Sequence, residues 1–357
     1  MLSEKQNALY EKVIKQYPIL KTADAAITDN VLIKIQNMPV IEHVPTDKID
    51  ISKEFNDIIY PPQKKFLIPP VSYLDTKQHY WTHRKATLIK RFGYMGKTID
   101  GVLGSGMMAS INKGASFFDP VLCEVIISWF GLPQGRVLNP FCGEASIGII
   151  AGEMGCDFVG VDIRRDQVAI NNDYIKQRKM EHPPRFIHGN SLKLKSVLLD
   201  NNVNDKFDLV FSSPPYYDLE MYSGDAGDLS NKQTFNDFMK DYYEIFKQAV
   251  DRLNDNRFLV VKVGEIRDEG GINRNFIGAN VFTFKKLGLN YYNEIILLNQ
   301  FGTAPMRFNQ NFRTRKIVKL HQNVLVFFKG DVKQIPHLYK EPIPLIGNKV
   351  TFRKDLF

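Results

Sequence analysis

Residues 136–146 read RVLNPFCGEAS, a short apolar strand that runs into a glycine turn and then into a helix. The pattern predicts a strand over Arg136–Leu138 and a helix over Ser146–Met154. Gly155 is a favourable residue to follow that helix, because glycine readily adopts a positive φ. A strand, a tight turn and a helix in this order open a β-α-β unit, so the stretch predicts an α/β fold.

The same alternation of strands and helices continues on both sides of this stretch. Further helices are expected over Val121–Phe130, Gln167–Arg178, Lys232–Leu253 and Phe276–Leu287. Further strands are expected over Phe158–Val161, Arg185–Ile187, Phe207–Phe211, Phe258–Val263, Asn293–Leu298 and Val324–Phe328. Repeated β-α units of this kind predict a doubly wound, mostly parallel sheet of seven strands.

The chain length of 357 residues suits two domains, or one large domain with additions. The β-α units occupy 116–330, which we expect to form the main domain. Short helical patterns over 1–60 predict an N-terminal helical extension. Proline pairs open the segment 61–115, which is expected to be an arm or linker. The segment 331–357 carries three prolines and is expected to be an irregular C-terminal tail.

The overall composition excludes several classes of protein. Hydrophobic residues make up 44% of the chain and charged residues 24%, which is ordinary for a globular protein and argues against disorder. Without a run of about 18 apolar residues, no transmembrane helix is expected. Three cysteines without a CxxC pair exclude a disulfide scaffold or a cysteine-rich zinc module, and they fit a reducing cytoplasm. No metal site is expected.

The net charge of +8 suggests a polyanionic partner such as a nucleic acid. Aromatic and basic residues interleave over 80–91, as they often do on nucleic-acid surfaces. The segment 306–319 holds five Lys and Arg and no acidic residue, and it is expected to be a loop at the rim of the sheet. Both segments also fit ordinary solvated charged surfaces. The candidate phosphate contacts are Arg84, Lys85, Arg307, Arg313, Arg315 and Lys316.

The turn after the first strand predicts a nucleoside site. A doubly wound sheet binds its ligand at the carboxyl ends of the strands, and Gly143 allows the backbone to approach the ligand closely. Asp162 ends the second strand at a spacing suited to accept hydrogen bonds from ribose hydroxyls. The pyrophosphate motif G-x-G-x-x-G is absent. A nucleoside without phosphates, such as S-adenosylmethionine, therefore fits better than a dinucleotide.

The fourth strand runs directly into Ser213-Pro214-Pro215-Tyr216. The prolines stiffen the turn and supply carbonyl groups without N–H donors. The Ser213 hydroxyl or carbonyl and the Pro214 carbonyl form a rigid pair of acceptors for both hydrogens of an amine. Tyr216 is placed to stack on the ring that bears this amine. Such acceptors would stabilise the positive charge that grows on the amine during methyl transfer, so the corner predicts N-methylation.

These motifs together resemble those of the DNA N4-cytosine/N6-adenine methyltransferases. Asn139–Ser146 resembles the D-P-F-x-G-x-G motif of the family, and Ser213–Tyr216 resembles its catalytic tetrad. Phe117–Pro120 lies where the family has an additional cofactor motif. The run Ser213–Ser223 is most similar to that of bacteriophage and prophage methylases. The closing stretch His321–Lys329 resembles the family's last strand.

The resemblance implies a Rossmann-like, class I S-adenosylmethionine-dependent methyltransferase whose catalytic domain spans 116–330. It implies that the amine of a DNA base is methylated after the base flips out of the duplex. The implied catalytic residues are Ser213, Pro214, Pro215 and Tyr216. The implied cofactor-binding residues are Phe118, Asp119, Asn139, Phe141, Gly143, Asp162, Ile163 and Asn190.

Three positions depart from the family pattern. Asn139 stands where the family usually has Asp, Ala145 replaces a second glycine, and Asn190 replaces the Asp that commonly follows the third strand. Each Asn keeps a hydrogen-bonding oxygen but loses a negative charge. Because the carboxylate at the first position helps to bind the cationic tail of the cofactor, weaker cofactor binding is one expectation.

The choice of substrate stays open at this point. A serine at the first tetrad position is commoner among cytosine enzymes, but the correlation decides neither base. Tyr217, Asp218 and Tyr222 follow the tetrad and either line the pocket of a flipped base or serve in capping and packing. Methylation of RNA or of a protein amide, and a non-catalytic DNA-binding role on a methylase scaffold, are the alternatives.

Overall fold

The computed structural model describes residues 2–17, 20, 25–38, 45–51, 54–55, 68, 70–93, 118–217, 227–302 and 304–346. The chain forms two compact units, Met1–Pro70 and Val71–Phe357. This division differs from the predicted one, because the boundary between the units falls within the expected arm 61–115, at Val71. Three prolines of the predicted proline pairs (Pro61, Pro62 and Pro69) and Phe117 lie outside the described residues.

The N-terminal unit is helical. It contains α1 (Glu4–Gln16), α2 (Ala25–Gln36) and the short 3₁₀ helix η3 (Thr46–Lys48). Ser3 begins α1 with a capping box, in which its side chain accepts from the Gln6 N–H and the Gln6 side chain accepts from the Ser3 N–H. The unit has its own apolar core, whose buried members are Leu9, Val13, Tyr17, Leu20, Val31, Ile35, Ile49, Ile51 and Phe55. The predicted helical extension therefore has the core of a small folding unit.

The larger unit is built on one eight-stranded sheet with the order β1-β7-β8-β6-β5-β2-β3-β4. The strands are β1 (Tyr73–Asp75), β2 (Arg136–Asn139), β3 (Asp157–Asp162), β4 (Arg185–His188), β5 (Phe207–Ser212), β6 (Leu253–Val263), β7 (Asn290–Leu298) and β8 (His321–Lys329). Only β8 runs antiparallel to its neighbours, β6 and β7. The doubly wound, mostly parallel α/β class predicted from the sequence is confirmed.

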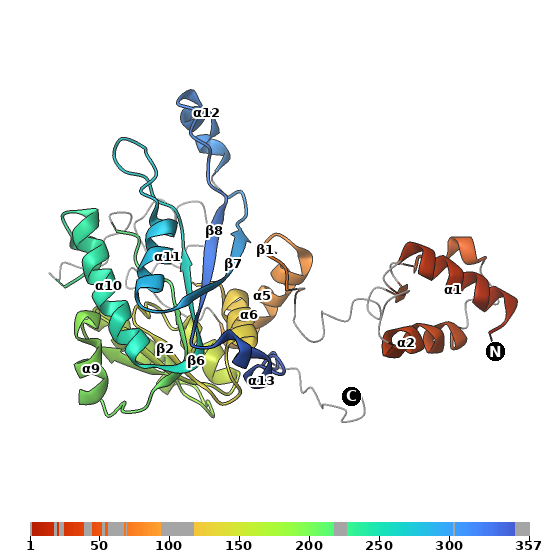
Figure 1. The fold of residues 1–357 in the computed structure, drawn as a ribbon, viewed down its shortest axis with the longest axis horizontal. Coiled ribbons are helices and arrows are strands. Elements are labelled where there is room, and N and C mark those ends of the chain that lie inside the picture. Colours follow the sequence, from red (N-terminus) through yellow and green to blue (C-terminus); the bar gives the residue numbers. More distant parts are fainter. Residues whose placement is uncertain are drawn as a thin grey trace. The chain divides into compact units, whose positions relative to one another are not determined.

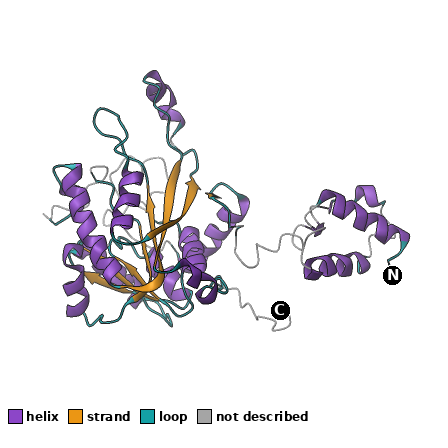
Figure 2. Cartoon of the chain, in the orientation of Figure 1, coloured by secondary structure: helices purple, strands orange, loops and turns teal. Residues whose placement is uncertain are grey.

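Helices cover both faces of this sheet (Figures 1 and 2). They are α5 (His79–Phe92), α6 (Pro120–Phe130), α7 (Ser146–Glu153), α8 (Arg165–Lys176), α9 (Leu194–Asp200), α10 (Phe235–Asp251), α11 (Phe276–Lys286), α12 (Pro305–Arg313) and α13 (Ile335–Leu338), with short 3₁₀ helices at Ser191–Lys193 (η4), Leu229–Asn231 (η5) and Val332–Gln334 (η6). None of the helices in the described part of the chain is long and apolar enough to span a membrane.

The described residues contain eight strands, one more than the seven predicted. Tyr73–Asp75 pairs in parallel with β7, with Tyr73 opposite Ile296 and Asp75 opposite Leu298. Three residues are too few for an alternating pattern to stand out in the sequence, so the sequence shows no sign of this edge strand. Strand pairing therefore joins the chain just after Pro70 to the main sheet.

Two further segments differ from their predicted form. The stretch 306–319, expected to be a loop, contains most of α12, whose first residue is Pro305, a favourable residue at the start of a helix. The predicted irregular tail contains α13 and then packs back on α6. There the Ile343 N–H donates to the Ser128 carbonyl at 2.9 Å, and the Ile346 N–H donates to Glu124 at 2.8 Å.

An aromatic core fixes the elements beside the carboxyl ends of β5 and β6. Phe238, Tyr242 and Phe246 lie at helical spacing on α10 and are fully buried, as the amphipathic pattern of the sequence predicts. They pack against Phe276 and Phe284 of α11, with ring centroids between 4.9 and 6.5 Å apart. Such rings contribute both buried area and preferred edge-to-face geometry. This layer supports the corner that follows β5.

Candidate active site

The order of the sheet strands reverses between β2 and β5, because β2 is followed along the chain by β3 on one side and pairs with β5 on the other. Ligands of doubly wound sheets bind at this point, outside the carboxyl ends of the strands. A cavity of about 190 Å³ lies there. Its lining includes these predicted residues: Phe118, Asn139, Phe141, Gly143, Asp162, Ile163, Asn190, Ser213, Pro214, Pro215 and Tyr216.

The Asp162 side chain stabilises the glycine turn by accepting hydrogen bonds from its backbone. The Asp162 carboxylate accepts from the Gly143 N–H at 2.7 Å and from the Arg164 N–H at 2.9 Å. Gly143 has φ +53°, a conformation that glycine adopts without strain, and a Cβ there would meet no atom within 4 Å. Burial raises the pKa of Asp162, and the neighbouring Arg164 opposes this shift. The carboxylate therefore shapes the turn as well as lining the cavity.

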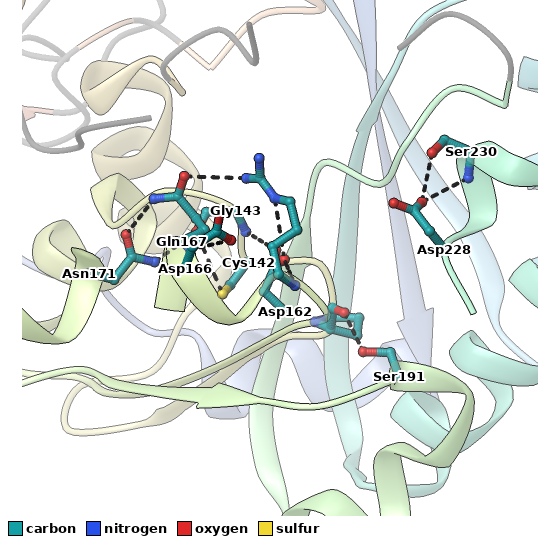
Figure 3. A network of polar contacts seen from close by, with 11 residues as sticks. Cys142, Gly143, Asp162, Asp166, Gln167, Asn171, Ser191, Asp228 and Ser230 are labelled. Carbon is teal, nitrogen blue, oxygen red and sulfur yellow. Dashed lines mark hydrogen bonds and ion pairs between the residues drawn. The ribbon is translucent and has the colours of Figure 1, made fainter. Parts of the chain in front are cut away.

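A chain of polar side chains holds the other side of the same turn (Figure 3). The Asn171 amide donates to the Gly143 carbonyl at 2.7 Å, and the Gln167 amide donates to Asn171 at 2.9 Å. Arg164 in turn donates to Gln167 at 3.3 Å. Because both faces of the turn are bonded to α8 and β3, Gly143 is fixed in a preformed site.

The side chain of Asn139 is fully buried, and its amide nitrogen has no hydrogen-bond partner among the described residues. Its carboxamide oxygen accepts from the Phe141 N–H at 3.0 Å and from the Ser212 hydroxyl at 2.7 Å. Its Nδ2 is buried and has no hydrogen-bond partner within the described structure. The backbone donor of Phe141 fixes the orientation of the amide, since only its oxygen can accept. An unpaired buried donor in a cavity wall is suited to an acceptor group of a ligand.

The tetrad forms a rigid corner on the opposite side of the cavity. Pro214 and Pro215 are buried, whereas Ser213 and Tyr216 are partly exposed to the cavity. The Tyr216 hydroxyl donates to the Lys262 carbonyl at 3.4 Å and accepts from the Gln322 amide at 3.2 Å. Its ring also lies edge-on to Phe276, with centroids 6.1 Å apart. These contacts fix the plane of the Tyr216 ring.

Tyr217 is a packing residue. Its side chain is only 6% exposed, and its hydroxyl donates to the Gln233 carbonyl at 2.9 Å. Its ring packs against Phe235 and Phe238. Of the two roles that the sequence left open, the structure places Tyr217 in the packing role. Asp218 and Tyr222 lie outside the described residues.

Asp119 is the one predicted cofactor residue that is absent from the lining of this cavity. One of its oxygens caps α6 by accepting from the Val121 N–H at 2.9 Å. The other accepts from the Trp81 indole at 3.2 Å and pairs with Lys85 at 2.9 Å. The residue lines a neighbouring pocket that shares Lys262 and Gln322 with the main cavity.

Arg84 does not form the exposed basic face that the sequence suggested. Its Nε donates to Glu124 at 2.7 Å, and a second nitrogen both pairs with Glu124 and donates to the Ile346 carbonyl at 2.8 Å. Glu124 is fully buried. The guanidinium therefore joins α5, α6 and the C-terminal segment, and a DNA contact by Arg84 is not supported.

Of the other predicted DNA contacts, Lys85 lies on α5 and pairs with Asp119. The remaining four lie on or just after α12, which projects beyond the ends of β7 and β8 (Figure 1). None of the residues of α12 is buried. The helix carries Arg307 and Arg313, and Arg315 and Lys316 follow it. Exposed apolar side chains accompany them, among which Met306 is 72% and Phe312 53% exposed. A helix of nine residues is only marginally stable by itself, so this projection is suited to a partner surface.

Several residues that line the cavity were not predicted as site residues from the sequence. They are Glu144, Ser191, Asp228, Lys262 and Gln322. Lys262 could have been found from the sequence, because it is the one charged residue in the apolar stretch Phe258–Val263, where a charge suggests a functional position. Glu144 lies within the glycine motif, at a position for which the family pattern D-P-F-x-G-x-G specifies no residue type. No group of His, Cys, Asp or Glu suited to a metal ion occurs among the described residues.

The structure is that of a Rossmann-like α/β protein with a cavity at the carboxyl ends of its central strands. Residues 207–354 match the family model described as DNA methylase, of the N6/N4 type. This match confirms the resemblance drawn from the sequence motifs, although it does not show the particular closeness to phage enzymes. The cofactor that this family implies is S-adenosylmethionine.

Two curated proteins are similar to parts of the chain. The Type II methyltransferase M.SmaI of Serratia marcescens is 34% identical over 65 residues, which is 18% of this chain and 22% of that protein. The Type II restriction enzyme HinfI of Haemophilus influenzae is 22% identical over 175 residues, which is 48% of this chain and 63% of that protein. The chain therefore spans less than two thirds of the length of either relative.

Solved structures with a similar arrangement include a methyltransferase from Pyrococcus furiosus. It is 17% identical, with a TM-score of 0.42, and the match covers 70% of this chain and 96% of that one.

The residues of the cavity fit S-adenosylmethionine. Asp162 supplies acceptors for hydroxyl groups, and the unpaired Asn139 Nδ2 supplies a donor suited to a carboxylate. The apolar surfaces of Phe141 and Ile163 line the same cavity and suit the face of an adenine ring.

Proposed function

We propose that the protein transfers a methyl group from S-adenosylmethionine to the exocyclic amine of a DNA base, at N4 of cytosine or N6 of adenine. The observation that carries this proposal is that one cavity is lined both by the glycine turn around Gly143 and by the Ser213–Tyr216 corner. In this proposal the nucleoside site and the amine-holding corner are adjacent.

The residues of the corner suit a reaction at a weakly nucleophilic amine. When bound, the cofactor supplies an electrophilic methyl group on a positively charged sulfur. Ser213 and the Pro214 carbonyl accept the two amine hydrogens, which localises the nitrogen lone pair and stabilises the positive charge that forms there. Tyr216 stacks on the base and fixes its orientation. As the bond from the methyl group to nitrogen forms, its bond to sulfur would break and leave a neutral thioether. The methylated nitrogen then carries a positive charge and is acidic, so it releases a proton to water and no strong base is needed.

The substrate in this proposal is duplex DNA whose target base is flipped into the corner. A base inside the stack cannot reach a cavity of this kind. The cluster of positive charge on and after α12 supports a phosphate backbone as partner, because Arg307, Arg313, Arg315 and Lys316 are accompanied there by no acidic residue. Lys85 stays a candidate contact, although it pairs with Asp119.

Neutralising Arg313, Arg315 and Lys316 together by glutamine is expected to weaken DNA binding at least tenfold near 0.1 M salt, because each phosphate contact releases condensed counterions. The slope of log affinity against log salt should become shallower by roughly one to three, at about 0.9 per contact. Fluorescence anisotropy with a labelled duplex over a salt series measures both quantities.

The matched control replaces three exposed lysines outside α12, namely Lys206, Lys333 and Lys340, by glutamine. This variant has the same change in net charge and should lose much less affinity. Equal losses in both variants would show that only the overall charge matters, and would remove α12 from the proposed DNA surface.

A further inference from the structure

Glu144 is a buried carboxylate in the wall of the cofactor cavity. Glu144 follows Gly143 in the turn that leads into α7, and the residue is only 7% exposed. One oxygen accepts from the Phe118 N–H at 3.0 Å, and the other accepts from the N–H and hydroxyl of Ser146 at 2.8 and 2.7 Å. Because a carboxylate offers about four acceptor sites, one site remains for a ligand.

A comparison with two other carboxylates, the buried Glu124 and the partly buried Asp162, shows what Glu144 lacks. Glu124 is fully buried and pairs with Arg84, and Asp162 lies 3.7 Å from the Arg164 guanidinium. In the described part of the chain, Glu144 forms no ion pair with Lys or Arg, and only burial and hydrogen bonds act on its pKa. Buried charges in proteins are normally paired. A carboxylate that lines a ligand cavity without a protein cation is suited to a cationic ligand.

We propose that Glu144 is the anionic partner of a positively charged group of the methyl donor, and that it supplies from the glycine turn the negative charge that Asn139 lacks. This inference rests on the proposed function, since it concerns the same cofactor. Glu144 would compensate for Asn139, which stands where the family usually has Asp, because Glu144 and Asn139 line the same cavity and lie close together in the chain. Through Phe118, the same carboxylate also joins the segment before α6 to this turn.

The charge state of Glu144 makes the interaction sensitive to pH. Burial raises its pKa to about 7, while its hydrogen bonds to Ser146 and Phe118 act in the opposite direction. The carboxyl is therefore mostly neutral at pH 6 and mostly charged at pH 8, so affinity for a cation should rise with pH over this range.

Other titratable groups surround Glu144. Cys123 of α6, Cys142 of the turn and Tyr174 of α8 all have a pKa raised above the ordinary value, so they stay neutral near pH 7. Asp162, Arg164, Asp228 and Lys262 also line the cavity.

Calorimetry with wild-type protein and with Glu144→Gln tests the proposal. The ligands are S-adenosylmethionine, which carries cationic groups, and 5′-methylthioadenosine, which has the same nucleoside without them. At pH 8 the variant should lose at least tenfold in affinity for the first ligand and change less than twofold for the second. Between pH 6 and 8 the affinity of the wild-type protein for S-adenosylmethionine should rise by about tenfold more than the affinity of the variant. The comparison with the variant corrects for titration of the amine of the ligand itself.

Equal losses for both ligands would mean that Glu144 only shapes the turn, and would overturn the inference. Unchanged affinity for both ligands would overturn it as well. Ser146→Ala is the structural control, because it removes one hydrogen bond of Glu144 and keeps the charge. If the wild-type protein bound 5′-methylthioadenosine but not S-adenosylmethionine, both the inference and the proposed function would fail. If S-adenosylmethionine bound alike to both proteins, only the inference would fail.

Discussion

Replacing Tyr216 by alanine is expected to lower the rate of methyl transfer by about a hundredfold, with little change in affinity for S-adenosylmethionine. The ring is held by Lys262, Gln322 and Phe276, so it offers a fixed face to the target base. Loss of such stacking costs about 1–3 kcal/mol per base, and a misplaced amine loses further rate. Single-turnover transfer measures the rate, and calorimetry measures cofactor binding.

Two variants separate stacking from other effects of this change. Tyr216→Phe keeps the ring and loses only the hydroxyl contacts, so it should retain most of the activity. Tyr217→Phe is the neighbouring control, because the Tyr217 hydroxyl bonds to Gln233 in the packed interior. If Tyr216→Ala abolished cofactor binding instead, the two halves of the cavity would be assigned wrongly. If it left the transfer rate unchanged, the corner would not hold the substrate.

Replacing Arg84 by methionine is expected to lower the free energy of unfolding of the larger unit by about 3–5 kcal/mol. The change leaves the Glu124 carboxylate buried without its cation, and breaking a buried pair on one side typically costs this much. It also removes the bond that Arg84 donates to the Ile346 carbonyl. Denaturant unfolding followed by tryptophan fluorescence, which reports on Trp81 and Trp129, measures the loss.

The double variant Arg84→Met/Glu124→Gln removes both charges and should recover a large part of this stability, since the uncompensated charge is gone. Lys85→Met is the matched surface control. Its side chain is 44% exposed and its pair with Asp119 should contribute no more than about 1 kcal/mol. A loss for Arg84→Met as small as that for Lys85→Met would contradict the structural role assigned to this pair.

The main features of the fold follow from local pattern. Apolar strands such as Phe207–Phe211 and the amphipathic face of α10 are set by the alternation of residue types, and the structure has these elements within a few residues of their predicted ends. The site follows from the fold, because the carboxyl ends of neighbouring parallel strands bring Gly143 and Ser213 together although they are 70 residues apart. The predicted cofactor and tetrad residues other than Asp119 line one cavity for this reason.

The features that the sequence did not predict depend on contacts between distant segments. β1 is a strand only because β7 offers it an edge, and Arg84 is a structural residue only because α6 places Glu124 beside it. The basic composition of 80–91 is the same whether a guanidinium faces solvent or a buried carboxylate. Glu144 likewise has no special appearance in sequence, since its significance lies in its burial without a cation.

The central claim is that this cavity transfers a methyl group to a base amine in DNA. Purified protein incubated with S-adenosylmethionine labelled in its methyl group and with unmodified duplex DNA tests it most directly, with digestion of the DNA and chromatography of the nucleosides. We expect the label in N4-methylcytosine or N6-methyladenine, and we expect the Tyr216→Ala variant to transfer it about a hundredfold more slowly. Label found only in RNA or protein, or no label under conditions in which a control methylase modifies the same DNA, would contradict it.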